Sequence, residues 1–165
     1  MIEIYLPKFE DLWFREKFLA DSETMSFNHR WGGTINWPKE KWKKWYQVWI
    51  ENNEGKRFYR YLINENGDFV GEIAYHLDES INKYLANVIV YAPYRKHGYG
   101  KAGLITLCEI AKSNGVDVLY DDIAIDNPSI EMFKKYDFVE EYRTNEIVML
   151  KKFSNNNFLK TKINL

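Results

Sequence analysis

The sequence predicts an α/β fold of the α+β type, with a mixed, mostly antiparallel sheet of about six or seven strands and helices on both faces. Two observations predict it. Between residues 57 and 91, three strand-like segments follow one another with only short turns between them, which is typical of an antiparallel meander. Beyond residue 98, helical and strand-like segments alternate, and the chain ends in two strand-like segments close enough to pair.

Composition indicates a folded protein of one domain. Its 165 residues are 45% hydrophobic and 17% aromatic, which gives the chain enough apolar surface for a substantial core. The formal net charge of -1 provides no general attraction to nucleic acid or to an anionic membrane. We therefore expect one domain over residues 1–152 and a loosely held tail, containing several Asn and Lys residues, over 153–165.

The cysteine content and the hydropathy pattern favour a cytoplasmic protein. Cys108 is the one cysteine of the sequence, so no disulfide can form within the chain. We find no signal sequence, no apolar run long enough to span a membrane and no metal-ligand motif. The expected partners therefore include neither nucleic acid nor a membrane, and both a monomer and a homodimer stay open.

The N-terminal third is predicted to hold a strand, two helices and an irregular segment. Residues 2–6 form the strand, which ends before a proline, and residues 21–37 are irregular. A second helix over about 38–52 begins at a proline, which suits the first turn of a helix. The first helix, over about 9–20, places these side chains near one face: Phe9, Leu12, Trp13 and Leu19.

Aromatic residues recur at helical spacing in the second helix. They are Trp42, Trp45, Tyr46 and Trp49, followed by Ile50. The stripe is either a stacking platform for a ligand or the core face of an amphipathic helix, and the second interpretation is favoured.

The remaining elements follow from turn signals. Asn66-Gly67 marks a hairpin between "RFYRYLI" and "DFVGEIAYHL", and "KYLANVIVY" (83–91) adds a third strand. A helix over about 100–113 ends at Asn114-Gly115, as glycine after a helix suggests. "VLYDDIAI" is the next strand, and Asn127 is well placed to cap a short helix. "FVEEYR" and "EIVMLKKF" form the final hairpin.

Residues 94–103, "YRKHGYGKAG", carry two glycine patterns that bind anions. Gly98-x-Gly100-x-x-Gly103 matches the dinucleotide fingerprint of oxidoreductases. Arg95-x-x-Gly98-x-Gly100 matches the loop with which another large class of proteins holds coenzyme A. Either would place a pyrophosphate at the N-terminus of a helix, where unpaired backbone N–H groups and the helix dipole favour anions.

The context favours the coenzyme A pattern. A dinucleotide-binding fold needs repeated strand–helix–strand units after its glycine loop, whereas residues 104–165 end in a predicted hairpin. The segments before the loop form a meander, although the fingerprint strand normally begins such a domain. A nicotinamide cofactor is therefore disfavoured, and we expect Gly103 to permit close packing of the helix against the sheet.

Two segments in order resemble the GNAT N-acetyltransferase superfamily, and the resemblance covers most of residues 55–150. The first is "VIVYAPYRKHGYGKAGL", a strand and a proline-containing turn followed by the glycine loop and a helix. The second is "IDNPSIEMFKKYDF", which is similar to the family's Asn-led helix ending in a Gly-Phe pair. The predicted order of elements also fits the family's fold.

The resemblance implies acetyl-CoA as cofactor and transfer of its acetyl group to a primary amine by direct attack in a ternary complex. Backbone atoms of Val88, Ile89 and Val90 would pair with the pantetheine arm and supply the oxyanion donor, with Asn127 near that arm. The glycine loop and its basic residues would hold the pyrophosphate, which gives this set: Arg95, Lys96, His97, Gly98, Tyr99, Gly100 and Lys101.

Departures from the family bear on the chemistry. The family often places an acid tyrosine where this chain has Phe133, and Tyr136 is the candidate substitute, with a packing tyrosine as the competing interpretation. Asp137 replaces the usual glycine before a phenylalanine, and Asn127 lies one residue closer to the serine than is usual. The missing tyrosine keeps a catalytically silent acyl-CoA-binding module as the alternative function.

The acceptor amine must lose a proton, because an alkylammonium has a pKa of about 10.4. We predict Glu72 as the base, with His76 behind it on the same strand face, although polar residues on a wet face fit the pattern equally. Strand alternation assigns Val70 and Ala74 to that face too, and Ile73, Tyr75 and Leu77 to the other. In the pair Asp121-Asp122, one carboxylate must face the cleft, where it would attract a cationic acceptor, and Asp122 is our candidate.

The acceptor is expected beside the irregular segment 25–37, which contains a Gly-Gly hinge. Asn28, His29 and Trp31 are the predicted acceptor contacts, with Arg30 between them. An aromatic loop of this kind could close over a compact ligand, so a small-molecule amine is favoured over a protein N-terminus.

Overall fold

The structure, a computed structural model, describes residues 2–154. It contains a seven-stranded sheet of order β1-β2-β3-β4-β5-β7-β6, which confirms the predicted mixed sheet. Neighbouring strands are antiparallel except β4 and β5, which are parallel. The strands are β1 (Glu3–Tyr5), β2 (Arg57–Ile63), β3 (Phe69–Asp78), β4 (Lys83–Val90), β5 (Val118–Ala124), β6 (Val139–Arg143) and β7 (Ile147–Phe153).

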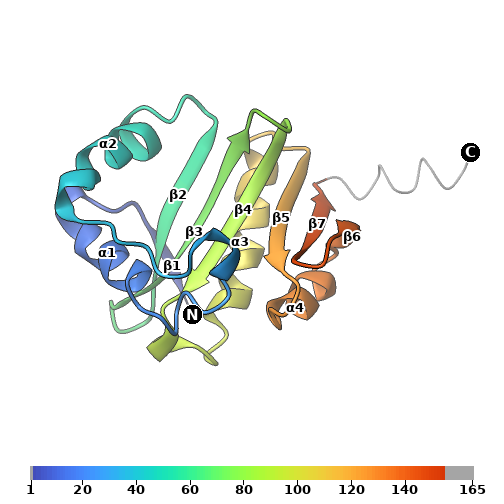
Figure 1. The fold of residues 1–165 in the computed structure, drawn as a ribbon. Helices are drawn as coiled ribbons and strands as arrows, with labels where there is room; N and C mark the ends of the chain where they lie inside the picture. Colours follow the sequence, from blue (N-terminus) through green and yellow to red (C-terminus); the bar gives the residue numbers. More distant parts are fainter. Residues whose placement is uncertain (1, 155–165) are drawn as a thin grey trace, which may run out of the picture.

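Helices cover both faces of this sheet, as predicted (Figure 1). On one face, α1 (Trp13–Leu19) and α2 (Trp42–Tyr46) enclose an aromatic core that includes Phe14, Phe18, Trp42 and Tyr61. On the other face, α3 (Tyr99–Ser113) and α4 (Ser129–Lys135) cover an aliphatic core that includes Leu62, Ile73, Leu104 and Leu107. Each face of the sheet thus has its own core.

The first helix differs from its prediction in phase. Residues Phe9–Leu12 form a 3-10 turn before α1 begins, and a 3-10 turn has three residues per turn instead of 3.6. The buried face is consequently rotated: Phe14 and Phe18 are buried, whereas Phe9 and Trp13 are 39% and 49% exposed. The expectation that Phe9 and Trp13 share the face of Leu12 is therefore wrong.

The second helix is divided into three pieces. A 3-10 turn (Lys39–Lys41) precedes α2, and a π-helical turn (Gln47–Glu51) follows it. A π turn widens the spacing of side chains, and such turns are frequent at functional sites. Trp42 is buried in the core as predicted, while Trp45 and Trp49 are only partly buried.

A bulge in β3 corrects one assignment made from strand alternation. Leu62 pairs with Gly71 and Ile63 with Phe69, so Val70 has no partner opposite it in β2. The extra residue shifts the alternation, and Val70 packs in the aliphatic core with Ile73 instead of sharing the face of Glu72.

The parallel pair β4 and β5 separates along its length. Its register contains Tyr84 opposite Leu119 and Leu85 opposite Tyr120, and no pair beyond these within the described residues. From Ala86 to Val90, the edge of β4 that faces β5 is therefore open. Figure 1 shows the two arrows side by side with α3 behind them and the loop to α3 at the C-terminal end of β4.

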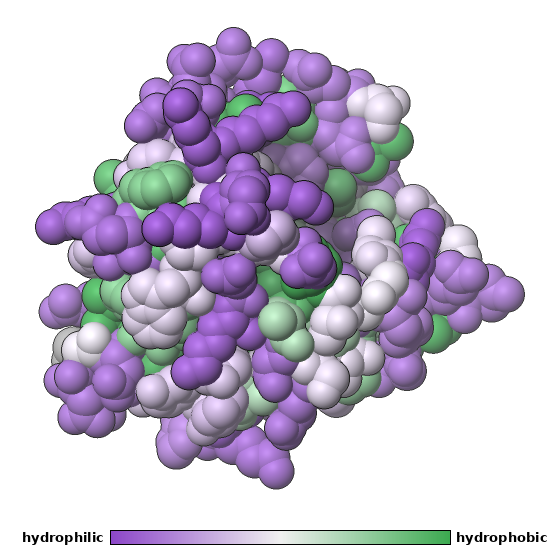
Figure 2. Space-filling view, turned by 60° about the vertical axis from the view of Figure 1, so that its left-hand side comes forward, coloured by the Kyte–Doolittle hydropathy of each residue, from purple (hydrophilic) through white to green (hydrophobic). Residues whose placement is uncertain are grey.

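The surface that carries α1 and α2 has no broad apolar area. Figure 2 shows hydrophilic side chains interleaved with small hydrophobic areas over the face turned to the viewer. Within residues 2–154, no helix combines the length and the apolar character needed to cross a membrane.

The predicted C-terminal tail falls mostly outside the described residues. β7 extends through Phe153, the first residue of that tail, and residues 155–165 are not described. The limits of the predicted domain, 1–152, remain a prediction.

Candidate active site

A cleft of about 480 Å³ occupies the opening between β4 and β5, and we call it the β4–β5 cleft. One wall is the strand Val88, Ile89 and Val90, and the far wall includes Ile123 and Phe133. Almost all predicted coenzyme residues line it: Val88, Ile89, Val90, Arg95, Lys96, Gly98, Tyr99, Gly100, Lys101 and Asn127. An open strand edge and a helix N-terminus thus border one cavity.

The glycine loop turns sharply into α3. Gly98 has φ +82° and Lys96 has φ +67°, both in the left-handed region, which glycine adopts without steric cost. The first N–H groups of a helix have no partner within it, and the N–H of Ala102 is the donor to the Gly98 carbonyl at 3.1 Å. Gly100 lines the cleft, and a Cβ at this position would be in ordinary van der Waals contact with Val90 Cγ2, at 3.6 Å. The loop can therefore receive an anion through backbone donors.

Two residues of the loop have other contacts. Arg95 donates from Nη1 to the Glu23 carbonyl at 3.1 Å and from Nη2 to the Thr24 carbonyl at 2.8 Å. Its guanidinium therefore braces the 21–28 turn against the loop, in addition to lining the cleft. His97 does not line the cleft, and its ring lies 5.7 Å from the ring of Tyr99.

The short helix α4 begins and ends through local contacts. Asn127 Oδ1 accepts a hydrogen bond from the Ser129 N–H at 2.9 Å, so this residue caps the helix and lines the cleft at once. At the other end, Asp137 has φ +71°, which explains why the related motif has a glycine there. The N–H of Phe138 reaches the Phe133 carbonyl at 3.2 Å, which closes the helix end.

Tyr136 and Phe133 lie in different places. Phe133 is buried and lines the β4–β5 cleft, whereas Tyr136 lines a separate cavity of about 310 Å³ beside Cys108 and Lys152. α4 ends at Lys135 and Tyr136 is already outside helical geometry, with ψ +35°, so helical spacing no longer aligns it with Phe133. The structure does not bring Tyr136 to the cleft.

A second cavity, of about 430 Å³, has four lining residues in common with the cleft, and we call it the tryptophan cavity. Its aromatic walls are Trp31, Trp45, Trp49 and Tyr59. Its polar lining consists of Arg15, Asn28, Glu72, His76, Asp78, Asn87, Asp121 and Asp122. The core interpretation of the tryptophan stripe is confirmed for Trp42, whereas Trp45 and Trp49 pack against the same core and also line this cavity.

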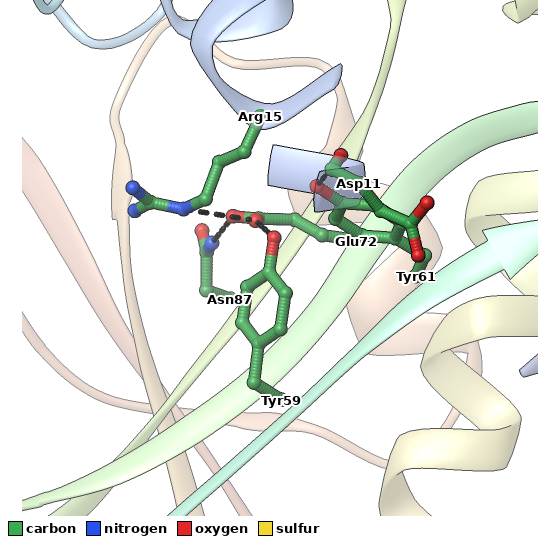
Figure 3. A network of polar contacts seen from close by, with 6 residues as sticks. All are labelled: Asp11, Arg15, Tyr59, Tyr61, Glu72 and Asn87. Atoms are coloured by element: carbon green, nitrogen blue, oxygen red, sulfur yellow. Dashed lines mark hydrogen bonds and ion pairs between the residues drawn. The ribbon is translucent and has the colours of Figure 1, made fainter. Parts of the chain in front are cut away.

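Glu72 lies at the base of this cavity in a hydrogen-bonded network (Figure 3). Its Oε1 accepts from Asn87 Nδ2 at 2.7 Å, and its Oε2 accepts from the Tyr59 hydroxyl. Arg15 Nε lies 3.6 Å from Oε2. Burial raises the pKa of Glu72, while Arg15 and the two hydrogen bonds act in the opposite direction and favour the carboxylate.

Arg15 is held between two indole rings. Its guanidinium carbon lies 4.4 Å from the ring centre of Trp37 and 4.5 Å from that of Trp45. Its Nε is buried and donates no hydrogen bond within residues 2–154. The ion pair with Glu72 therefore compensates this cation, and the remaining carboxylates give the tryptophan cavity an acidic lining.

The two neighbouring aspartates of β5 lie where the two cavities meet, since both line each of them. Asp121 shares the strand face of Leu119 and Ile123, which belong to the aliphatic core. Burial raises the pKa of both carboxyls, and Asp121 is raised the further, with the charge of Asp122 adding to the effect. Burial also lowers the pKa of nearby His76, which favours a neutral imidazole.

The predicted acceptor segment contributes unequally. Asn28 lines both cavities and donates from Nδ2 to the Gly33 carbonyl at 2.8 Å, which closes its own loop. Trp31 lines the tryptophan cavity and is 48% exposed. His29 lines neither, and its Nε2 lies 3.2 Å from Asp126 Oδ1 at the exposed surface. The structure thus brings Asn28 and Trp31 to the site but not His29.

Sequence reasoning missed Arg15, Tyr59 and Asn87. They belong to α1, β2 and β4, and strand register places Tyr59 and Asn87 on either side of Ala74, two residues along β3 from Glu72. A polar residue in an apolar strand pattern was the available signal for Asn87.

A family model described as the Acetyltransferase (GNAT) family matches residues 5–138. No curated protein matches the chain. A spermidine N-acetyltransferase from Vibrio cholerae, solved in complex with CoA and spermine, has a TM-score of 0.79 and 13% identity over 93% of this chain and 95% of that one. An N-acetyltransferase from Staphylococcus aureus Mu50 has a TM-score of 0.73 and 16% identity over 94% and 99%.

A protein from Salmonella typhimurium, assigned as an acetyltransferase and solved with its cofactor acetyl-CoA, has a TM-score of 0.71 and 16% identity over 94% and 95%. At these identities the likeness shows the fold. The family match over most of the chain shows more: this protein belongs to the GNAT acetyltransferase family, which uses acetyl-CoA.

Proposed function

We propose that this protein transfers the acetyl group of acetyl-CoA to a primary amine of a small molecule, by direct attack in a ternary complex. The observation that carries the proposal is the meeting of two cavities. The β4–β5 cleft has an anion-binding loop at one end, and it shares four lining residues with the tryptophan cavity: Asn28, Asn87, Asp121 and Asp122. A coenzyme in the first and an amine in the second would meet at this junction.

The cleft suits the coenzyme. The N-terminus of α3 and the basic side chains of Lys96 and Lys101 would hold the pyrophosphate. The open edge of β4 would pair with the pantetheine arm as an added strand does, and a backbone N–H of Val88, Ile89 or Val90 would stabilise the thioester oxygen as it gains charge.

The tryptophan cavity suits a cationic acceptor of modest size. Indole rings attract cations over their faces, and Trp31 and Trp49 line this cavity together with Asp78 and Asp122. The related fold in the spermidine N-acetyltransferase of Vibrio cholerae, which was solved with spermine, supports an amine of this class.

Glu72 is the proposed base. Three groups, Arg15, Tyr59 and Asn87, favour its ionised form, and a base must be ionised to accept a proton. Both carboxylate oxygens of Glu72 already accept hydrogen bonds. The acceptor amine, or a water bridging to it, would therefore have to displace one of these donors before it gives its proton to Glu72. One chain supplies both cavities, so the proposal holds for a monomer and for a homodimer. We place the reaction in the cytoplasm, in line with the single cysteine.

Binding and turnover separate the proposal from its alternatives. Acetyl-CoA should raise the melting temperature, because a ligand of the native state stabilises it, whereas NAD and NADP should not. Thiol release from acetyl-CoA is then measured over polyamines, aminoglycosides, other small amines and peptides. Turnover with a small amine supports the proposal, and coenzyme binding without turnover on any acceptor would indicate a silent acyl-CoA-binding module.

A further inference from the structure

The β4–β5 cleft has an apolar side chain where the family often has its acid. Phe133 is 3% exposed and packs edge-on against Phe138, with ring centres 5.0 Å apart. Tyr136 lines another cavity. If acetyl transfer occurs as proposed, a different group must protonate the departing thiolate or it leaves unaided.

Asp121 has a distinctive place in the sheet. Tyr120 is the last residue of β5 that pairs with β4, so Asp121 is the first residue beyond the point where the strands separate. On its other side it pairs with Leu150 of β7. Its strand face is otherwise apolar, since Leu119 and Ile123 both lie in the aliphatic core. A carboxyl group therefore stands at the apex of the split.

This apex is the end of the cleft where the reactive end of the coenzyme belongs. The pyrophosphate site, at the N-terminus of α3, lies beyond Val90 at the C-terminal end of β4. The open edge runs back from Val90 to Ala86, a length of roughly 13 Å at about 3.3 Å per residue. A pantetheine arm fixed at the loop and extended along this edge would point its sulfur toward the apex.

Asp121 also lacks the contacts that hold a carboxylate ionised. Within residues 2–154 its side chain makes no hydrogen bond or ion pair, whereas Glu72 has contacts with Arg15, Tyr59 and Asn87. Its burial and the neighbouring charge of Asp122 both raise its pKa. Two carboxyls in one site with opposite environments are suited to opposite roles, one as base and one as acid.

The other titratable groups of the two cavities are placed elsewhere. Those of the cleft come from the loop and the start of α3, and those of the tryptophan cavity face the acceptor side. They are Tyr94, Arg95, Lys96, Tyr99 and Lys101 in the cleft, and Arg15, Tyr59, Glu72, His76 and Asp78 in the tryptophan cavity. Asp122 lines both cavities but lies on the strand face opposite that of Asp121.

We propose that Asp121 is the general acid of the acetyl transfer and gives its proton to the sulfur of coenzyme A. The inference rests on the proposed function. The neutral amine attacks the thioester carbon and forms the C–N bond, and the nitrogen then gives one proton to Glu72. As the C–S bond breaks, its electron pair stays on sulfur, which takes the proton of the Asp121 carboxyl. The products are the amide and the free thiol, and solvent returns the proton from Glu72 to Asp121.

The test compares Asp121→Asn with Asp122→Asn, its neighbour on the opposite strand face, in the full chain with acetyl-CoA and a polyamine. Asp121→Asn should lower kcat by about 10²-fold with unchanged acetyl-CoA affinity in calorimetry. An acid must be protonated, so wild-type kcat should fall as pH rises through its pKa, and this alkaline limb should vanish in Asp121→Asn. Asp122→Asn should raise the KM for the amine and leave the alkaline limb of the kcat profile in place. Asp121→Glu, which keeps a carboxyl group, should also retain this limb.

The outcomes that overturn the proposal are distinct from failure of the enzyme assignment. A wild type that releases no thiol with any amine removes the acetyl-transfer function itself. An active wild type whose Asp121→Asn variant keeps both kcat and the alkaline limb removes only the acid assignment. If the alkaline limb is kept in Asp121→Asn and lost in Tyr136→Phe, the general acid is the tyrosine. Asp121→Leu, which matches the apolar face of the strand, provides a second folded variant lacking the carboxyl.

Discussion

Arg15 Nε lies 3.6 Å from Oε2 of Glu72, and the two side chains are 16% and 2% exposed. A carboxylate removed from water this far would normally take up a proton, because burial disfavours the charged form. The guanidinium and two hydrogen bonds partly offset that tendency, although burial still leaves the pKa of Glu72 raised. These contacts favour the ionised form that a base requires, and they give the first prediction its sign.

Glu72→Gln should lower turnover by about 10²–10⁴-fold with little change in acetyl-CoA affinity, because the amide cannot accept the proton of the amine. The acid limb of the pH–rate profile should disappear with the carboxylate that it reports. Initial rates over a pH series, with calorimetric titration of the coenzyme, provide the measurement. Wild-type turnover with an intact acid limb would place the base elsewhere.

Tyr59→Phe tests the same network without removing the carboxylate. The tyrosine hydroxyl donates to Glu72 and favours its ionised form, so its loss should raise the pKa of Glu72 and move the acid limb to higher pH. The limb should persist. A profile that does not move would separate Glu72 from the ionisation seen in the rates.

The glycine loop has a matched control just beyond the other end of α3. Replacing Gly98 and Gly100 with valine should abolish acetyl-CoA binding while the chain stays folded, because side chains would then block the anion. Gly98 has φ +82° and Gly115, just past the far end of α3, has φ +81°. Gly115→Val should carry a similar strain, about 1–3 kcal/mol, and keep its coenzyme affinity. Calorimetry that finds equal affinity in both folded variants would refute the loop assignment.

Asp121 should also influence the pH dependence of stability. Its pKa is raised in the folded state, so its contribution to the free energy of unfolding is fully present below the unfolded pKa of about 3.9 and is lost as pH rises through the folded value. Asp121→Asn has no such loss. Its stability relative to wild type should therefore increase with pH from about 4 upward, as urea unfolding at several pH values would show. A constant difference would indicate an unperturbed carboxyl.

Asp137→Gly should stabilise the protein by about 1 kcal/mol. Asp137 has φ +71°, a conformation that costs free energy for a residue with a Cβ and almost none for glycine. The closing hydrogen bond from the Phe138 N–H to the Phe133 carbonyl should be kept. Chemical denaturation provides the measurement, and an unchanged or lower stability would mean that the aspartate side chain compensates the strain.

The sequence predicted the parts of the site that are local along the chain. The glycine loop, the cap at Asn127 and the left-handed position at Asp137 are each determined within a few residues, so turn chemistry and a family resemblance suffice for them. The seven-stranded sheet followed from turns and alternation in the same way.

The residues around Glu72 in the tryptophan cavity could not be predicted, because pairing of strands that are far apart in the sequence brings them together. Asn87 and Tyr59 meet Glu72 only through the registers of β2, β3 and β4, and Arg15 is added from a helix whose phase a 3-10 turn shifts. Asp121 is distinguished from Asp122 by the residue at which β5 leaves β4, and a sequence pattern does not contain that register.

We expect acetyl-CoA in the β4–β5 cleft to give its acetyl group to a small amine in the tryptophan cavity. Isotopically labelled acetyl-CoA, the wild-type protein and a polyamine test it most directly, with mass spectrometry of the amine and titration of the released thiol. We expect one labelled acetyl group on amine nitrogen for each thiol released, with the yield reduced in Glu72→Gln. Thiol release without labelled amine, or bound coenzyme that yields neither product, would contradict it.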